Sequence, residues 1–191
     1  LRRRGFLPPS IYEFCLATGI SKAESTMTWH DLEARNRRLL DSITNRYFFI
    51  ENPRKIKIKN APGIEALAPL HPEHPEKGFR KIRTGAEFYV QDKLEKEQIY
   101  RFMHLFNFKN NEFVSKDIDA RLSAKMIHWL PVAKDLVKIE IVMPDASVKK
   151  GLGEPLLKDV EINQAVHFER FGFCRLYKKE KNKLRFYFSH K

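Results

Sequence analysis

One stretch near the carboxyl end of the sequence, AVHFERFGFCRLYKK, mixes core-forming side chains with side chains that could recognise a ligand. Successive side chains of a strand point to opposite faces, so we expect Val166 and Phe168 to anchor a core while His167 and Arg170 face solvent. A guanidinium offers a planar fork of donors and a stacking face, which suits an unstacked nucleotide base. Glu169 could orient Arg170 or pair with a neighbouring lysine. The alternative is that His167 and Arg170 only line the surface and pair with nearby carboxylates.

Lysine and arginine side chains offer a second chemistry, the binding of phosphate. The chain has 36 basic and 24 acidic residues and a formal net charge of +12, which favours nucleic acid first and an anionic membrane second. In KIKIK, Lys55, Lys57 and Lys59 alternate with isoleucines, which predicts a strand with its lysines on one face. A single exposed lysine is best explained as solvated surface, whereas the clusters favour contact with a phosphate backbone. The basic residues of the carboxyl-terminal cluster are Arg175, Lys178, Lys179, Lys181, Lys183, Arg185 and Lys191.

Other chemistries lack a motif in the sequence. There is no GxGxxG, P-loop, GxSxG or HExxH pattern, so no catalytic residue is assigned. His71 and His74 lie in PLHPEHPEKG, where prolines favour a rigid loop and no third soft ligand follows, so no metal site is assigned. Cys15 and Cys174 have no CxxC or histidine spacing, which indicates a cytosolic protein without a disulfide scaffold. No apolar run approaches the roughly 20 residues of a membrane span.

The elements that must position these side chains fall into two ranges. Residues 1–45 are predicted to form a helical connector, with Ser10 and Glu13 as the capping box of a first helix and Thr28 and Asp31 as that of a second. Beyond it, YFFI, KIKIK, FRKIRTGAEFYV, LVKIEIVM, VHFERFGF and LRFYFS show the period of two that is typical of strands, with proline and glycine between them. Many short strands favour small β-barrels over a wound parallel sheet.

Several segments, in the same order, resemble the class I glutamyl- and glutaminyl-tRNA synthetases of the archaeal and eukaryotic type. Residues 1–53 resemble the helical connector that follows their catalytic domain. HPEHPEKGFR is similar to their His-Pro loop, MIHWLPV to their Ile-His-Trp strand, and EPLLKDV with VHFERFGFCRL to the closing strands of their anticodon-binding barrels. The resemblance implies a mainly β fold, in which a connector of residues 1–45 precedes two β-barrels within residues 46–191, related to a ribosomal-protein barrel.

The resemblance also implies site residues. His167 and Arg170 match positions that read anticodon bases, and Arg46 and Arg101 match further anticodon-contacting arginines. Met103 stands where the family has a second arginine near the first anticodon base, and a basic loop is shortened, so recognition of the first and third bases does not carry over directly. Contacts with the tRNA backbone are expected from Lys55, Lys57, Lys178, Lys179 and Arg185.

The departures at Met103 and the loop favour a glutamyl over a glutaminyl member. The resemblance then implies that the full-length enzyme ligates glutamate to tRNA(Glu) with ATP and Mg. The HIGH-type and KMSKS-type motifs are absent, so this fragment should bind tRNA without a cofactor and without activity. The shortened loop leads to the hypothesis that tRNA(Gln) is accepted as well.

We expect a cytoplasmic monomer with no membrane partner. Two alternatives stay open. One is the corresponding region of a glutaminyl-tRNA synthetase, and the other is a stand-alone RNA-binding barrel like that ribosomal protein.

Overall fold

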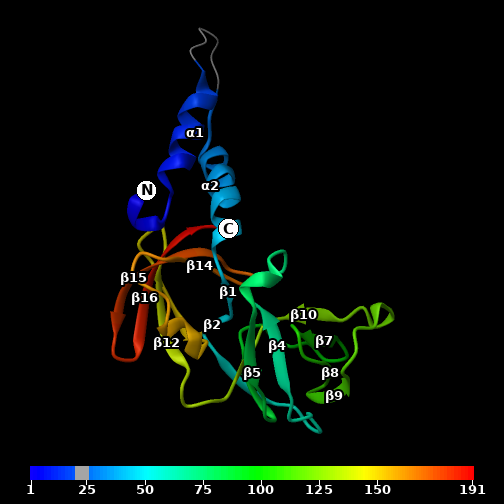
Figure 1. Ribbon diagram of the computed structural model, residues 1–191. Helices are drawn as coiled ribbons and strands as arrows, with labels where there is room; N and C mark the ends of the chain where they lie inside the picture. The colour runs from blue at the N-terminus through cyan, green and yellow to red at the C-terminus, as the bar shows by residue number, and fades with distance from the viewer. Residues whose placement is uncertain (20–25) are drawn as a thin grey trace.

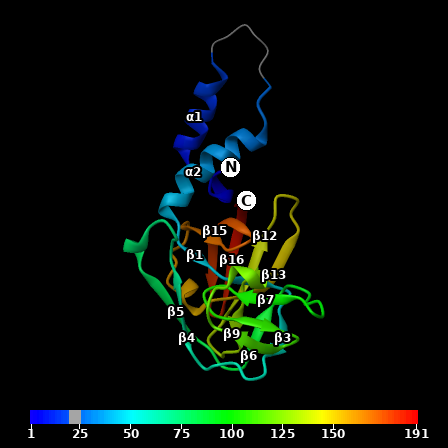
Figure 2. The same cartoon turned by 90° about the vertical axis from the view of Figure 1, so that its right-hand side faces the viewer.

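The computed structural model describes residues 1–19 and 26–191. Helices α1 (Pro8–Thr18) and α2 (Trp29–Ile43) lie side by side as a hairpin, which projects from a mainly β body (Figures 1 and 2). A short turn, η1 (Arg2–Arg4), precedes the hairpin. Neither of these helices combines the length and the apolar character that crossing a membrane requires.

The start of α1 differs from the predicted capping box. Pro8 occupies the first turn and Leu7 caps the helix, so Ser10 lies inside it. The Ser10 hydroxyl donates to the Leu7 carbonyl at 2.7 Å, and Glu13 forms an ion pair with Arg38 of α2 at 3.6 Å. The prediction of a capping box at Ser10 and Glu13 is therefore wrong, because Pro8 with its fixed φ already starts the helix, whose N-cap lies three residues earlier than predicted.

The predicted capping box at the start of α2 is confirmed. The backbone N–H of Thr28 donates to Asp31 Oδ2 at 2.7 Å, and this contact with Thr28 holds the pKa of Asp31 below its ordinary value. Sequence analysis did not single out Asn36, which is fully buried between the two helices. Its Oδ1 accepts from the backbone N–H of Leu7 at 2.8 Å, so a buried amide ties the start of α1 to α2.

A seven-stranded sheet forms the half of the body next to the helices, with the order β1-β14-β15-β16-β12-β13-β2 (Figure 1). Its edge strands, β1 (Arg46–Tyr47) and β2 (Phe49–Glu51), are separated in sequence by Phe48 alone. Neighbouring strands lie about 4.8 Å apart, so a flat sheet could not bring its two edges so close, and the sheet curls into a half-barrel. Its other strands are β12 (Val137–Val142), β13 (Val148–Gly153), β14 (Ala165–Phe168), β15 (Gly172–Glu180) and β16 (Lys183–His190), with the turn η4 (Pro155–Lys158) after β13.

The rest of the body, called the small-sheet half below, contains a three-stranded sheet β11-β6-β3, a four-stranded sheet β10-β7-β8-β9 and the hairpin β4-β5. A bridge between Lys59 and Glu112 joins the two sheets at one side, and residues 128–129 join β10 to β11 at the other. The elements of this half are β3 (Arg54–Lys57), β4 (Glu65–Pro69), η2 (Pro75–Lys77), β5 (Phe79–Arg83), β6 (Glu87–Val90), β7 (Ile99–Phe102), β8 (Asn107–Lys109), β9 (Glu112–Ser115), η3 (Ala120–Leu122), β10 (Lys125–Ile127) and β11 (Leu130–Pro131).

Two hydrophobic cores meet at the segment that joins β1 to β2. Tyr47 and Phe49 pack into the core of the seven-stranded sheet, whereas Phe48 and Ile50 pack into the core of the small-sheet half. Successive side chains of an extended chain point to opposite faces, so this segment is a wall shared by both cores. This explains why YFFI is apolar at every position instead of alternating.

The mainly β class and the leading helices are confirmed. The alternation predicted for KIKIK is also confirmed, since Lys55 and Lys57 are exposed while Ile56 is half-buried and Ile58 is fully buried. Strand pairing gives a curled half-barrel in the seven-stranded sheet, and it does not by itself establish the two closed barrels that were expected.

Candidate nucleic-acid interface

Strand β14 carries Val166, His167 and Phe168 with the predicted alternation of faces, but the histidine is less exposed than expected. Val166 and Phe168 are buried in the core of the seven-stranded sheet, and His167 between them is half-buried on the opposite face. Parallel pairing of β1 with β14 sets Arg46 beside His167. Two of the four predicted base-contacting residues therefore lie on neighbouring strands.

The imidazole of His167 is packed and uncharged. It stacks on the ring of Phe173 with a centroid distance of 4.4 Å and an interplanar angle of 24°. Burial, together with the positive charge of Arg46, lowers the pKa of His167 to about 4, so the ring is neutral near pH 7. Its Nδ1 atom is buried and has no hydrogen-bond partner among the described residues. Because Nδ1 is buried, a hydrogen bond from this ring to a base edge would use Nε2, and the neutral ring adds no charge for phosphate.

The guanidinium of Arg46 lies beside this imidazole and contacts the end of α2. Its Nη2 atom is 3.3 Å from Oδ1 of Asp41, and the same oxygen is 3.7 Å from Nε2 of the buried His71. Asp41 therefore contacts both Arg46 of β1 and His71 of the His-Pro loop. The loop is held there by Lys77, whose Nζ donates to the carbonyl of Ser42 at 2.7 Å.

Arg170 occupies the turn between β14 and β15 with a φ of 61°. Its Nη1 and Nη2 donate to Oδ2 and Oδ1 of Asp92 at 2.8 and 2.7 Å, and Nη1 lies 3.1 Å from Nδ1 of His128. The bonds to Asp92 raise the pKa of Arg170. Burial alone would raise the pKa of Asp92, but the hydrogen bonds and charge of Arg170 outweigh it and hold that pKa below its ordinary value.

The carboxylate that orients Arg170 is Asp92, and not its sequence neighbour Glu169. The charges of Arg46 and Arg80 act on Glu169, where they oppose a rise in its pKa that burial causes. Asp92 lies 78 residues before Arg170, and no local pattern in the sequence connects the two.

Arg101 lies apart from this group, in β7 of the four-stranded sheet. It is only 8% exposed, and burial lowers its pKa. Its Nη1 donates to Oδ1 of Asn107 at 3.1 Å and to the carbonyls of Lys116 and Asp117 at 3.1 and 3.2 Å. The side chain thus anchors the loop that follows β9.

The predicted backbone-contacting residues fall in two places. Lys55 and Lys57 lie on the exposed face of β3, where Lys55 pairs with Glu87 at 2.9 Å. At the tip of the β15–β16 hairpin, Lys178 lies opposite Arg185 in the strand register. The contacts there are Lys178 to Glu180 at 3.1 Å, Lys179 to the Lys158 carbonyl at 2.7 Å, and Arg185 to Glu140 at 2.8 Å.

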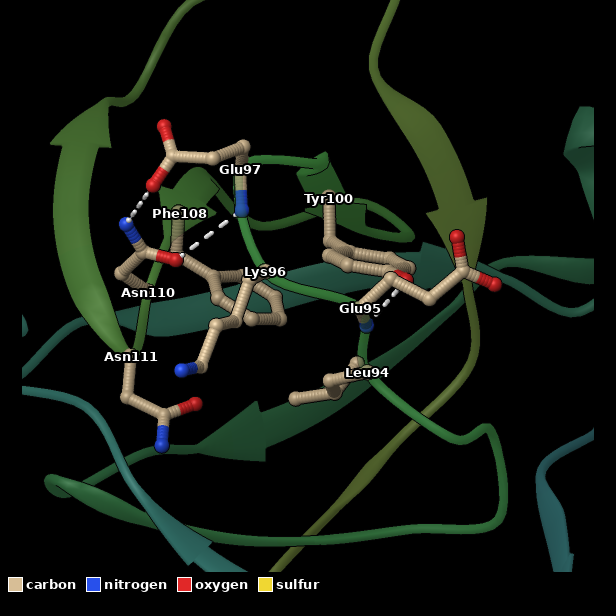
Figure 3. Close-up of a pocket in the computed structure, with 8 residues that line it drawn as sticks. All are labelled: Leu94, Glu95, Lys96, Glu97, Tyr100, Phe108, Asn110 and Asn111. Carbon is tan, nitrogen blue, oxygen red and sulfur yellow. Dashed lines mark hydrogen bonds between the residues drawn. The ribbon is translucent and has the colours of Figure 1, made fainter.

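A surface hollow of about 370 Å³ opens on the small-sheet half, and sequence analysis did not predict it. Figure 3 shows that Asn110 bridges Glu97 at one side, accepting from its backbone N–H at 3.2 Å and donating to its carboxylate at 2.9 Å. The lining has two carboxylates and one ammonium, so its charge does not favour phosphate. The lining residues are Leu94, Glu95, Lys96, Glu97, Tyr100, Phe108, Asn110 and Asn111.

Within residues 1–19 and 26–191, no group of three His, Cys, Asp or Glu side chains is arranged to hold a metal ion.

Comparison with known proteins identifies relatives of this chain. Residues 44–126 match the family described as tRNA synthetases class I (E and Q), anti-codon binding domain. The glutamate–tRNA ligase of Methanocaldococcus jannaschii is 39% identical over 94% of the chain, and those of Methanobrevibacter smithii and Pyrococcus furiosus are 36% and 38% identical over all of it. The chain spans 34–36% of the length of these relatives.

Proposed function

Residues 44–126 belong to the anticodon-binding domain family of the class I tRNA synthetases for glutamate and glutamine, and from this premise we propose that the chain binds the anticodon stem-loop of a tRNA. The observation that carries the proposal is a neutral imidazole, His167, accompanied by the guanidiniums of Arg46 and Arg170 on one strand pair and its turn. Imidazoles and guanidiniums recognise the unstacked bases of single-stranded loops. The net charge of +12 adds attraction for the backbone.

In this proposal each predicted residue has a distinct role. His167 and Arg170 read the central anticodon base, and Arg46 contacts the anticodon beside them. Arg101 contributes through the loop that it anchors, because its side chain is almost fully buried and its Nη1 is engaged with three acceptors. The proposed backbone contacts are Lys55, Lys57, Lys178, Lys179 and Arg185.

We further propose that the chain is the C-terminal part of a longer glutamate–tRNA ligase. The relatives carry that name and are about three times as long as the matched region. The longer protein would join glutamate to tRNA(Glu) with ATP and Mg as a cytoplasmic monomer, and this chain alone would bind tRNA without activating glutamate.

The division of the chain is part of the proposal. Residues 1–45 form a helical connector, and residues 46–191 form two barrels. Support for the first barrel comes from the two edges of the seven-stranded sheet, which meet across Phe48. Support for the second comes from the bridge of Lys59 to Glu112 and the short link 128–129, which join the two sheets of the small-sheet half at both sides.

The proposed tRNA specificity extends to tRNA(Gln). Anticodons for glutamate and glutamine share a central U and differ in the third base. The shortened loop supplies fewer basic contacts, so the third base is held loosely, and Met103 offers no guanidinium to the first base.

The test is equilibrium binding of the 191-residue chain to RNA hairpins with a glutamate anticodon, a glutamine anticodon and an unrelated anticodon. We expect similar Kd values for the first two and a Kd at least tenfold higher for the third. A tenfold preference, about 1.4 kcal/mol, between glutamate and glutamine hairpins would refute the dual specificity. Equal affinity for all three hairpins would refute anticodon recognition.

A further inference from the structure

We propose that Asp92 and His128 are positioning residues, which fix the guanidinium of Arg170 so that one edge of it meets a carbonyl oxygen of an RNA base. This inference rests on the proposed function and adds two residues of the small-sheet half to it. Asp92 follows β6, and His128 lies between β10 and β11, whereas Arg170 belongs to the seven-stranded half. The residue that reads the base is therefore held by the other half of the body.

His128 can accept a hydrogen bond from Arg170 in only one tautomer, and its second contact selects that tautomer. Its Nε2 lies 2.8 Å from the carbonyl oxygen of Phe49, which can only accept, so Nε2 carries the proton. Nδ1 then presents a lone pair to Nη1 of Arg170 at 3.1 Å. Burial lowers the pKa of His128 to about 4, so the ring keeps this lone pair near neutral pH.

Three of the five N–H donors of the Arg170 guanidinium are already engaged, and the other two lie along one edge. A guanidinium has five N–H donors in fixed directions. Asp92 takes one from Nη1 and one from Nη2, and His128 takes the second from Nη1. The Nε–H and one Nη2–H remain, parallel along one edge, and no described residue accepts from them. The side chain is 35% exposed, and we assign this unoccupied edge to the ligand.

The contacts of Asp92 and His128 with Arg170 also explain why Arg170 keeps its orientation when no RNA is bound. The side chain of Asp92 is only 12% exposed and His128 is buried, so turning Arg170 away would leave a carboxylate and an imidazole nitrogen without partners. Leaving such groups unpaired is costly. Arg170 therefore presents its open edge before RNA arrives, and little side-chain freedom is lost on binding.

A pair of parallel donors fits one carbonyl oxygen, which has two lone pairs. Uracil has such oxygens. Changing uracil to cytosine replaces one of them with an amino group, and this amino group is a donor that cannot accept from the N–H groups of Arg170. Phosphate could also accept from this edge, but it would do so with any base. The central base therefore distinguishes base reading from backbone contact.

The test is a double-mutant cycle on the 191-residue chain with Asp92→Asn, Arg170→Ala and both together. Binding is measured to hairpins with a central U and a central C. Asp145→Asn is the matched control, because Asp145 is exposed and its carboxylate accepts from Ser147 of its own turn. Chemical unfolding is recorded for every variant, so that a loss of stability is separated from a loss of binding.

We expect Asp92→Asn to weaken binding to the central-U hairpin about fivefold, to leave the central-C hairpin almost unchanged, and to have no further effect when Arg170 is already alanine. Equal losses on both hairpins, or a fivefold loss that persists in the Arg170→Ala background, would overturn the inference. If Asp92→Asn does not fold, Asp92→Glu keeps the charge and moves the carboxylate, and unchanged discrimination there would equally overturn it. If the unmodified chain binds neither hairpin, the proposed function itself fails. If it discriminates between them and the Asp92 variants do so as well, only the positioning role fails.

Discussion

At the scale of single residues, burial sets the charge of the candidate interface. His128 and His167 both have a pKa near 4 because their rings are shielded from water. Near neutral pH they act as hydrogen-bonding groups, and the positive charge around them comes from arginine. Neither ring therefore adds nonspecific attraction for phosphate, and His128, whose two nitrogens are already engaged with Phe49 and Arg170, acts on a ligand only through Arg170.

This burial predicts how stability depends on pH. An unfolded histidine titrates near 6.5, whereas folded His128 titrates near 4. Between these values the unfolded chain binds a proton that the folded chain does not, so the free energy of unfolding rises with pH through this window and falls as pH drops below 6.5. His128 should contribute up to about 1.4 kcal/mol per pH unit there.

The measurement is urea unfolding at pH 7, 6 and 5 for the unmodified chain and for His128→Gln. The variant lacks the titrating group, so its free energy of unfolding should change less between pH 7 and pH 5. The same slope in both proteins would contradict the assignment.

At the scale of elements, the shared wall between the two cores depends on close approach of β13 to β2. Gly151 pairs with Glu51 in this antiparallel contact. A Cβ atom at position 151 would lie 2.0 Å from the carbonyl oxygen of Ile50 and 2.7 Å from the ring of Phe49. No side chain fits there, so the pairing of β13 with β2 requires glycine at position 151.

We therefore expect Gly151→Ala to destabilise the fold by about 3 kcal/mol or more, since backbone and a packed ring would have to move. Guanidinium unfolding measures this cost. Gly85→Ala is the matched control, because nothing lies within 4 Å of a Cβ there, and its effect should stay within about 0.5 kcal/mol. Similar costs for the two variants would show that the strands can separate without penalty.

At the scale of the whole molecule, one buried ion pair joins the two halves. Arg80 of β5 is fully buried, and its Nη1 donates to Oε1 of Glu154, which follows β13. The same oxygen accepts from the backbone N–H of Phe48 at 2.6 Å, at the point where the two edges of the seven-stranded sheet meet. Burial raises the pKa of Glu154, and the charge of Arg80 opposes that rise.

Glu154→Gln should cost about 3–5 kcal/mol of folding free energy, because it leaves the guanidinium of Arg80 buried without a counter-charge. Replacing Arg80 as well, with Arg80→Met in the Glu154→Gln background, should recover a large part of that loss, because no charge is then buried and the glutamine oxygen still accepts from the Phe48 N–H. Denaturant unfolding compares these variants with Glu65→Gln, which removes an exposed pair with Arg83 at 3.5 Å and should cost less than about 1 kcal/mol. A cost for Glu154→Gln no larger than this would mean that water reaches the pair.

The sequence alone determined the features that depend on local periodicity. Alternation along a strand places Val166 and Phe168 in the core and His167 on the opposite face, and the spacing of Thr28 and Asp31 specifies the start of α2, because these patterns act over a few residues. That His167 is half-buried on its own face did not follow from the alternation. The same local reasoning failed at Ser10, where the preceding prolines start the helix earlier. It also predicted a mainly β body behind two helices.

The tertiary structure decided how the charged residues pair and where the two cores share a wall. Asp92 and His128 reach Arg170 from 78 and 42 residues away, and Glu154 reaches Phe48 across 106 residues. Such contacts follow from long-range strand pairing, which leaves no period in the sequence. The sequence therefore predicts that Arg170 faces solvent, whereas only the folded chain determines which edge of its guanidinium is free.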